Sequence, residues 1–233
     1  MSEFEEELSW ALCGRGTVDR RECLFVGDTP SSLVMLGMRQ LPMLVTQRHV
    51  RSIIADKGTM GGHGHGIGLG QLARLPTLLA SPAMVMDSLE GSSRRDVVLL
   101  VLAETDADGL PLVCAVRPDG RSVHLGVEVD SNHVLSLYGK RNAEGLVQRA
   151  REQGKILFVD EEMTRGLEVQ SQLQLLRGIG GLPRNRLLHG SEVLAHEADR
   201  MSQEARFRPV DLDAPDRCRG ACAPRSCDGR LAR

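Results

Sequence analysis

The stretch DVVLLVLAETDADGLPLVCAVR, residues 96–117, decides the fold class of this chain. It holds two apolar runs, Asp96–Glu104 and Leu112–Arg117, on either side of the turn sequence Asp106-Ala107-Asp108-Gly109. Runs of this length that are rich in Val and Leu and bounded by turn residues are typical of β-strands, and so short a turn joins antiparallel neighbours. We therefore expect these two strands to lie at the centre of an antiparallel sheet.

The flanking residues extend the sheet and place helices ahead of it. Helical spacing of apolar residues precedes Ala83, and strand patterns dominate from Ala83 to Lys140. The expected helices are Glu3–Cys13, Ser31–Leu36, Gln47–Asp56, Leu69–Leu79, Asn142–Gln153 and Glu161–Arg177. The expected further strands are Glu22–Val26, Leu41–Val45, Ala83–Met86, Ser122–Val129, with a turn at Pro118-Asp119-Gly120 before it, Asp130–Lys140 and Lys155–Val159. Helices first and a sheet second predict an α+β fold, with the N-terminal helices packed on an antiparallel β-sheet.

The apolar periodicity divides the chain into three parts. Residues 1–26 read as an N-terminal helix and strand, and residues 27–189 as the main domain. Beyond Pro183 the periodicity fades and charge rises, so residues 190–233 are expected to form a polar, disordered tail rich in Cys and Arg.

Composition limits the kinds of partner. The formal net charge of −2 provides no overall basic field, so a nucleic acid would have to be held by a local basic patch. No apolar run reaches the roughly 18–20 residues that a membrane span needs, and the N-terminus is acidic, unlike a signal peptide. We expect a cytoplasmic protein without a membrane partner.

The six cysteines do not predict a metal site or a disulfide framework. Cys13, Cys23 and Cys114 are isolated in apolar surroundings, where a free thiol usually behaves as a small core residue. Cys218, Cys222 and Cys227 cluster in the tail, but their spacing lacks a CxxC pair and a clear fourth ligand.

The glycine loop, Gly61-Gly62-His63-Gly64-His65-Gly66-Ile67-Gly68, is the main candidate for chemistry. Glycine backbones can come close to a ligand, so the loop is either a flexible surface segment or a binding cradle. The loop contains no GxGxxG register and is not followed by GK[ST], which argues against a nucleotide cofactor. A zinc site would need further ligands, and His49 and His133, which could supply one, stand at no characteristic spacing.

Phosphodiester chemistry on RNA gives a third interpretation of the loop. Such a reaction needs a base for the 2′-hydroxyl, an acid for the departing 5′-oxygen and cations for the phosphorane charge, but no metal. His49, His63 and His65 are candidates for proton transfer because the pKa of imidazole lies near neutrality. The candidates for holding the phosphate are Arg48, Arg51, Lys140 and Arg141.

A second polar stretch runs from Ser131 to Lys140. Alternate residues of a strand share a face, so Asn132, Ser136 and Tyr138 are expected to line one surface. Tyr138 is the only tyrosine of the chain, and it could equally be a simple rim residue.

An ordered set of short motifs resembles the phage-associated nuclease domains of the barnase/EndoU/colicin/RelE-like superfamily, found in phage and mobile-element polyvalent proteins beside MuF-type head proteins. The set spans about Gly27 to Gly181 and comprises Gly27-x-Thr29-Pro30-x-x-Leu33, Leu41-Pro42, Thr46-Gln47-x-His49, Gly62-x-x-His65-Gly66, Leu75-Pro76, Ser81-Pro82, Ser131-Asn132, Ser136-x-Tyr138-Gly139-Lys140 and Ile156-Leu157-Phe158-Val159-Asp160. The resemblance implies an α+β nuclease fold and a metal-independent ribonuclease or toxin activity.

The resemblance also suggests site residues. His49 and His65 match its polar positions in the helical half, and Ser136, Tyr138 and Lys140 match those in the sheet half. With these five as catalytic candidates, the expected substrate-binding residues are Arg48, His63, Gly64, Gly66, Asn132 and Arg141.

The leading hypothesis is thus a metal-independent endoribonuclease that needs no cofactor, acts on RNA and could have an immunity or antitoxin protein as partner. Two alternatives stay open: an inactive phage or mobile-element module that binds RNA or protein, and a zinc-dependent hydrolase.

Overall fold

The two apolar runs beside Asp106–Gly109 form neighbouring antiparallel strands near the middle of an eight-stranded sheet. The computed structural model describes residues 2–13, 22–90, 96–178 and 188–189. Along the sheet the order is β1-β2-β6-β5-β4-β3-β7-β8. The strands are β1 (Cys23–Asp28), β2 (Pro42–Thr46), β3 (Pro82–Met86), β4 (Val98–Thr105), β5 (Pro111–His124), β6 (Val127–Gly139), β7 (Ile156–Val159) and β8 (Leu188–His189).

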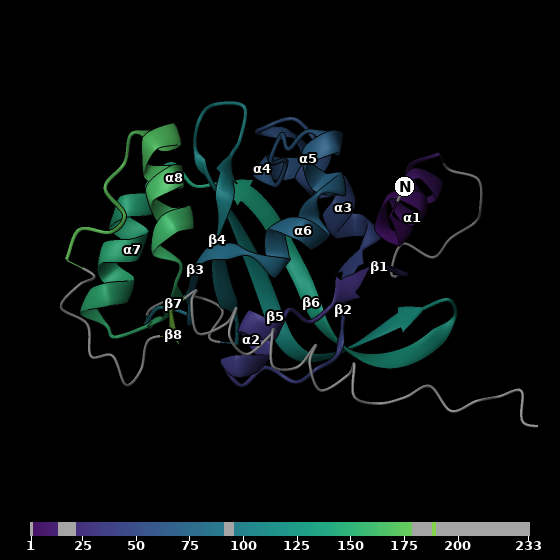
Figure 1. Ribbon diagram of the computed structural model, residues 1–233. Coiled ribbons are helices and arrows are strands. Elements are labelled where there is room, and N and C mark those ends of the chain that lie inside the picture. Colours follow the sequence, from purple (N-terminus) through teal and green to yellow (C-terminus); the bar gives the residue numbers. More distant parts are fainter. Residues whose placement is uncertain (1, 14–21, 91–95, 179–187, 190–233) are drawn as a thin grey trace, which may run out of the picture.

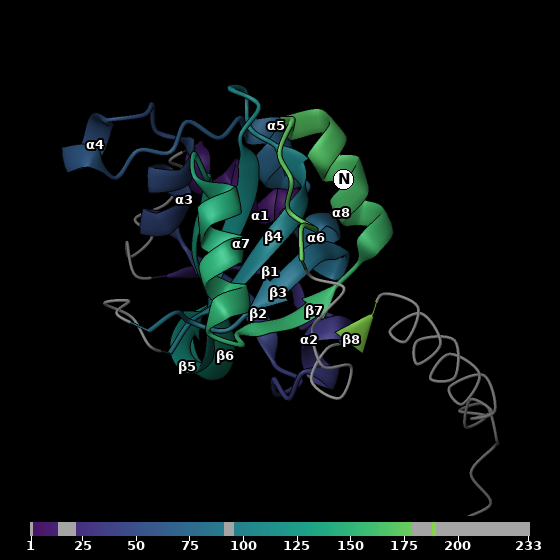
Figure 2. The ribbon, with the colours of Figure 1, turned by 90° about the vertical axis from the view of Figure 1, so that its left-hand side faces the viewer.

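Helices cover both faces of this sheet. They are α1 (Glu3–Leu12), α2 (Ser31–Met35), α3 (Gln47–Ile54), α4 (Thr59–Gly62), α5 (Leu69–Ala73), α6 (Leu75–Ala80), α7 (Ala143–Glu152) and α8 (Glu161–Ser171). Figure 1 shows α7 and α8 on the left of the sheet and α1, α3 and α5 on its right. In the turned view of Figure 2, α7 and α8 lie toward the viewer and α4 projects from the domain beyond α3. The α+β class expected from the sequence is confirmed.

The predicted tail, residues 190–233 with Cys218, Cys222 and Cys227, lies outside the described residues.

Alternation along the strands separates two hydrophobic clusters. In β4, Leu100 and Leu102 face the larger cluster beneath α1, α3, α5 and α6, whereas Val101 faces the smaller one beneath α7 and α8. Both faces of a central strand are therefore buried, which explains its nearly continuous apolar sequence. Residues of α1 and β1, such as Phe4 and Leu24, belong to the larger cluster, so the N-terminal helix and strand share a core with the main domain.

The sheet is mixed, and the expectation of a purely antiparallel sheet is wrong. β2 pairs with β6 in parallel, with Met43 opposite Asn132 and Val45 opposite Val134. β7 and β8 are also parallel. Short turns predict antiparallel pairing only between strands that are consecutive in the chain, and these two pairs join strands that are far apart in it.

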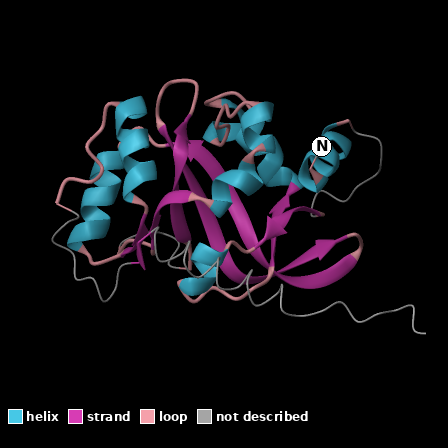
Figure 3. Cartoon of the chain, viewed as in Figure 1, coloured by secondary structure: helices cyan, strands magenta, loops and turns pink. Residues whose placement is uncertain are grey.

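The predicted turn at Pro118-Asp119-Gly120 is also wrong, because β5 runs straight through it. The register shifts between Arg117 and Gly120, and Asp119 has φ +52°, so these residues form a bulge. The backbone N–H of Asp119 donates to Asn132 Oδ1 (3.0 Å) across the pair. The real turn is at Leu125-Gly126, and Figure 3 shows the far half of this hairpin projecting from the sheet.

A second bulge changes which side chains of β6 face each side of the sheet. Ser136 pairs with Ala115 and Val134 pairs with Val116, so Leu135 is the extra residue. Because a bulge shifts the alternation by one position, Asn132 and Val134 no longer share a face with Ser136 and Tyr138. The expectation that Asn132, Ser136 and Tyr138 line one surface is therefore wrong.

Three helices are shorter than the sequence suggests. The predicted helix Leu69–Leu79 is two helices that meet at Arg74, because Pro76 has no N–H to continue the ladder. The helix α3 ends at Ile54, ahead of Ala55 in extended conformation, and α8 ends where Gln172 adopts φ +56°.

The cysteines and the helix lengths bear on two further expectations. Cys13 is exposed at the end of α1, whereas Cys23 and Cys114 are buried as expected. No helix in the described ranges has the length and apolar character needed to cross a membrane.

We predict that Val113→Asp unfolds the domain. Val113 is 0% exposed in β5, and an unpaired carboxylate there should lower the free energy of unfolding by about 4 kcal/mol or more. The matched control is Val169→Asp on α8, where the valine is 81% exposed and the loss should be below about 1 kcal/mol. Urea denaturation followed by circular dichroism measures both, and equal midpoints for the two variants would contradict this placement of β5.

Candidate functional site

The candidate site lies where β2 and β6 separate. Their parallel pairing ends at Val45 and Val134, after which β2 leads into α3 and β6 forms its bulge at Leu135. A pocket of about 460 Å³ occupies this place. It is lined by Arg48, His49, Ser52, Met60, His63, His65, Leu135 and Ser136. The carboxyl end of a strand whose neighbour diverges is a common position for a ligand site.

The helix α3 supplies one wall of the pocket. The Thr46 side chain caps the helix by accepting a hydrogen bond from the backbone N–H of His49 (3.1 Å). Val50 and Ile53 are buried in the larger cluster, which fixes the rotation of the helix. His49 and Ser52 are three residues apart and half-buried, so they lie together at the border between core and solvent.

The glycine loop continues this wall, and its backbone is bound to α3. Four consecutive N–H groups donate to backbone carbonyls, three of them to α3 or to Ala55 just after it and one to Thr59 of α4. The bonds run from Gly64 to Thr59 (3.1 Å), from His65 to Ser52 (3.0 Å), from Gly66 to Ala55 (2.8 Å) and from Ile67 to Ile53 (2.9 Å). The Ser52 hydroxyl also donates to the carbonyl of His63. The loop therefore presents its imidazoles, and not these four amides, to the pocket.

Two glycines are required by this arrangement. A Cβ on Gly64 would lie 2.1 Å from the carbonyl oxygen of Asp56, and Gly66 has φ +66°. Both positions were expected to bind substrate through their backbones. The structure uses both N–H groups inside the protein instead, so they act as spacers that let His65 approach α3.

His65 meets the sheet half of the site. Its ring lies 5.6 Å, centroid to centroid, from the ring of Tyr138, and Lys140 Nζ lies 6.0 Å from the Tyr138 centroid on β6. Burial, followed by the nearby His63, lowers the pKa of His65 below its ordinary value. Burial raises the pKa of Tyr138, whose hydroxyl therefore stays protonated at neutral pH. The pocket thus brings together His49 and His65 of the helical half and Ser136 of the sheet half, and Tyr138 contacts His65 beside it.

Several residues predicted to take part in the site are not among those that line the pocket: Arg51, Gly64, Gly66, Asn132, Tyr138, Lys140 and Arg141. Asn132 is fully buried, donates to Thr29 Oγ1 (2.8 Å) and to the carbonyl of Arg39 (3.0 Å), and accepts from Asp119. Its amide joins three segments at the far end of β6. Arg141 is exposed after the end of β6 and is not among the residues that line the pocket.

Three lining residues were not predicted. Ser52 follows His49 by three positions, and this helical spacing could have identified it. Met60 has φ +53° beside Gly61, a conformation that the sequence of an ordinary methionine does not indicate. Leu135 enters the wall through the β6 bulge, which has no local signal in the sequence.

The zinc alternative gains no ligand set from the structure. His133 lies on the far part of β6, with its Nε2 2.5 Å from Ser122 Oγ, and does not line the pocket. In the portion of the chain that is described, no group of three or more His, Cys, Asp or Glu side chains is arranged to hold a metal ion.

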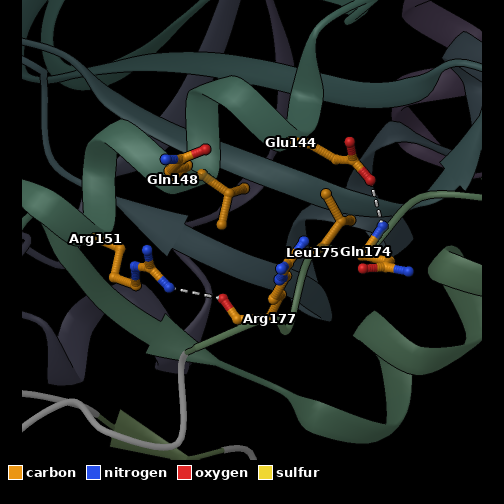
Figure 4. Close-up of a pocket in the computed structure, with 7 residues that line it drawn as sticks. Glu144, Gln148, Arg151, Gln174, Leu175 and Arg177 are labelled. Carbon is orange, nitrogen blue, oxygen red and sulfur yellow. Dashed lines mark hydrogen bonds between the residues drawn. The ribbon is translucent and has the colours of Figure 1, made fainter.

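A second pocket of about 390 Å³ lies between α7 and the segment after α8 (Figure 4). Arg151 donates to the carbonyl of Arg177 (2.9 Å), and the Glu144 carboxylate accepts from the backbone N–H of Gln174 (2.6 Å). These polar groups bind the segment to α7, so the contacts have a structural role.

We predict that Gly64→Ala weakens the loop. The added methyl group meets the Asp56 carbonyl, so either the loop or the end of α3 must move, and the free energy of unfolding should fall by about 2 kcal/mol or more. Gly70→Ala is the control, because that glycine is helical and has open space around its Cβ position. If thermal unfolding shows no greater loss for Gly64→Ala than for Gly70→Ala, the contact with Asp56 is not rigid.

The comparison with protein families gives a match over part of the chain. Residues 58–165 match the family model described as the phage MuF C-terminal domain. The matched segment includes His63, His65, Ser136, Tyr138 and Lys140, and begins after α3 with its Arg48 and His49. No curated protein and no solved structure matches the chain. The match associates this chain with phage proteins.

Proposed function

We propose that the pocket between α3, the glycine loop and β6 cleaves RNA without a metal ion, as a phage-derived endoribonuclease of the barnase/EndoU/colicin/RelE-like kind. One observation carries the proposal: three imidazoles, a guanidinium and two hydroxyls line a single pocket. They are His49, His63, His65, Arg48, Ser52 and Ser136. Acid, base and phosphate-binding groups are what this reaction needs.

His65 is suited to be the general base. Its burial favours the neutral imidazole, and its contact with Tyr138 limits the orientations of the ring. In the reaction it would take the proton of a 2′-hydroxyl, whose oxygen then attacks the adjacent phosphorus. The bond from phosphorus to the 5′-oxygen breaks, which leaves a 2′,3′-cyclic phosphate.

His49 lines the same pocket from α3, and we assign to it the protonation of the departing 5′-oxygen. The neighbouring Arg48 is exposed and can pair with the phosphate, and Lys140 adds a second positive charge on the Tyr138 side. Because the whole chain has a net charge of −2, attraction for RNA would depend on these local cations. The phage association and the resemblance of the motifs both support this function.

The decisive experiment is digestion of single-stranded RNA by purified protein in EDTA, with analysis of the product ends. The proposal expects cleavage that leaves a 2′,3′-cyclic phosphate and a 5′-hydroxyl. Intact RNA, with binding to RNA or to a partner protein retained, would instead support the inactive binding module. Activity that EDTA abolishes and zinc restores would support the hydrolase alternative.

We predict that His49→Ala, His65→Ala and Lys140→Ala each slow cleavage by roughly 10²-fold, because each removes a proton-transfer or charge-stabilising group. His63→Ala is the control within the loop. Its side chain is exposed, so we expect a loss of less than about 10-fold. If the His63 variant loses activity and the His65 variant keeps it, the roles within the loop are exchanged.

The pH dependence of kcat/KM gives an independent prediction. The general base must be neutral, and the pKa of His65 is lowered by burial, so the acidic limb of the profile should have its midpoint below 6.5. The rate then falls as the pH drops through this lowered pKa and His65 becomes protonated. A midpoint above 6.5 would mean that another group acts as the base.

A further inference from the structure

A charge cluster joins the glycine loop to the turn between β4 and β5. Lys57, just before the loop, binds Asp106 (Nζ to Oδ2, 2.8 Å) and Asp108. The Asp106 side chain is 1% exposed, whereas the side chains of Lys57 and Asp108 are 44% and 63% exposed. The cluster therefore has one buried and one solvent-facing carboxylate, and Lys57 is their common partner.

Asp106 is fixed within its own turn. Its Oδ1 accepts from the backbone N–H groups of Asp108 (2.9 Å) and Leu110 (2.9 Å). Burial opposes ionisation of this carboxyl, but the hydrogen bonds from Lys57 and from the turn outweigh burial, so its pKa is lowered. A charged Asp106 is thus a stable anchor for the Lys57 ammonium.

The cluster touches both halves of the candidate site. A Cβ on Gly139, the neighbour of Tyr138, would lie 1.9 Å from Asp106 Oδ2. A Cβ on Gly66, the neighbour of His65, would lie 3.1 Å from Lys57 Cγ. The Lys57–Asp106 pair therefore connects the backbone beside His65 with the backbone beside Tyr138.

The hydrogen bonds of the loop backbone do not themselves connect the loop to β6. The N–H groups of residues 65–67 bind the loop to α3 and to Ala55 just after it, and that of Gly64 binds Thr59 in α4, but none of these bonds reaches β6. They fix the loop relative to the helix, and the placement of that unit against β6 needs other contacts. Lys57 supplies a polar one.

We propose that Lys57 is a positioning residue, which holds the loop against β6 so that His65 keeps its contact with Tyr138. This inference rests on the proposed function for its effect on cleavage, but the contact itself can be measured without activity. Loss of Lys57 should let the loop move away from β6 and expose His65 to water.

The titratable and charged groups near His65 are His63 in the loop, Arg48 and His49 on α3, Tyr138 on β6 and Lys140 just after it. The cluster of Lys57, Asp106 and Asp108 has a net charge of −1, which Lys57→Met changes to −2, and the added negative charge by itself favours protonated His65. Asp108→Asn changes this net charge to 0, so a rise in the pKa of His65 in that variant would report increased exposure to water, and the Overhauser effect reports movement of the ring in both variants.

The test compares Lys57→Met with Lys155→Met in the 233-residue chain. Lys155 forms a comparable pair with Asp87 (3.2 Å), and both side chains of that pair are partly exposed, away from the loop. Nuclear magnetic resonance measures the titration of His65 and the Overhauser effect between His65 and Tyr138, whose signals are unambiguous because it is the only tyrosine. We expect Lys57→Met to raise the pKa of His65 towards 6.5, to weaken the Overhauser effect and to lower kcat by about 10-fold with little change in KM. Lys155→Met should leave all of these unchanged.

Two further variants keep the test sharp. Lys57→Arg preserves the ion pair and should restore the titration of His65 and the rate. Asp108→Asn removes only the ion pair with the exposed carboxylate and should shift the titration of His65 and the Overhauser effect less, in the same direction. This variant replaces Lys57→Met in the test if Lys57→Met does not fold. An unchanged His65 titration and Overhauser effect in both Lys57→Met and Asp108→Asn would overturn the positioning role. If the wild-type protein cleaves no RNA, the proposed function fails, whereas the magnetic resonance comparison still decides the role of Lys57.

Discussion

The hydrogen bonding of the glycine loop to the end of α3 is the interaction on which the candidate site depends. Backbone amides of residues 65–67 satisfy carbonyls that a helix end otherwise leaves to water or to side chains. The same bonds place His63 and His65 beside Ser52 on the wall opposite β6. The same hydrogen bonds thus end α3 and position the loop histidines, so a change that breaks them disturbs both the helix end and the site.

The sheet contributes to the candidate site at the place where the pairing of β2 with β6 ends. The parallel contact between β2 and β6 covers only three residue pairs, after which the two strands part. Beyond this point β2 no longer covers the edge of β6, and Ser136 lines the pocket there. The bulge at Leu135 turns this part of β6 relative to Asn132, so one strand serves the core connections at one end and the candidate chemistry at the other.

Local signals in the sequence were sufficient for much of the fold. The Thr46 cap, the strands beside Asp106–Gly109 and the helix α7 follow from residues within a few positions of one another. The meeting of His49, His65, Ser136 and Tyr138 at one place was anticipated through the resemblance of motifs, and not through spacing. The features that sequence could not reveal depend on contacts between distant residues. The pairing of β2 with β6 joins residues about 90 positions apart, and no composition rule selects it. The bulges at Asp119 and Leu135 exist because of registers set across strands, and the pairing of Lys57 with Asp106 spans 49 positions.

The uneven crowding of the loop glycines has a consequence for how the site could diversify. Gly64 is closed to any side chain, and Gly66 combines a positive φ with a close Lys57 neighbour, whereas Gly68 and Gly70 have open space and no positive φ. At the outer end, Met60 already carries a long side chain in a left-handed conformation at the pocket rim. Substitutions at Met60, Gly68 and Gly70 can therefore change the rim of the pocket and the approach to α5, and so alter which ligands fit. The spacing between the two loop histidines would meanwhile be inherited without change.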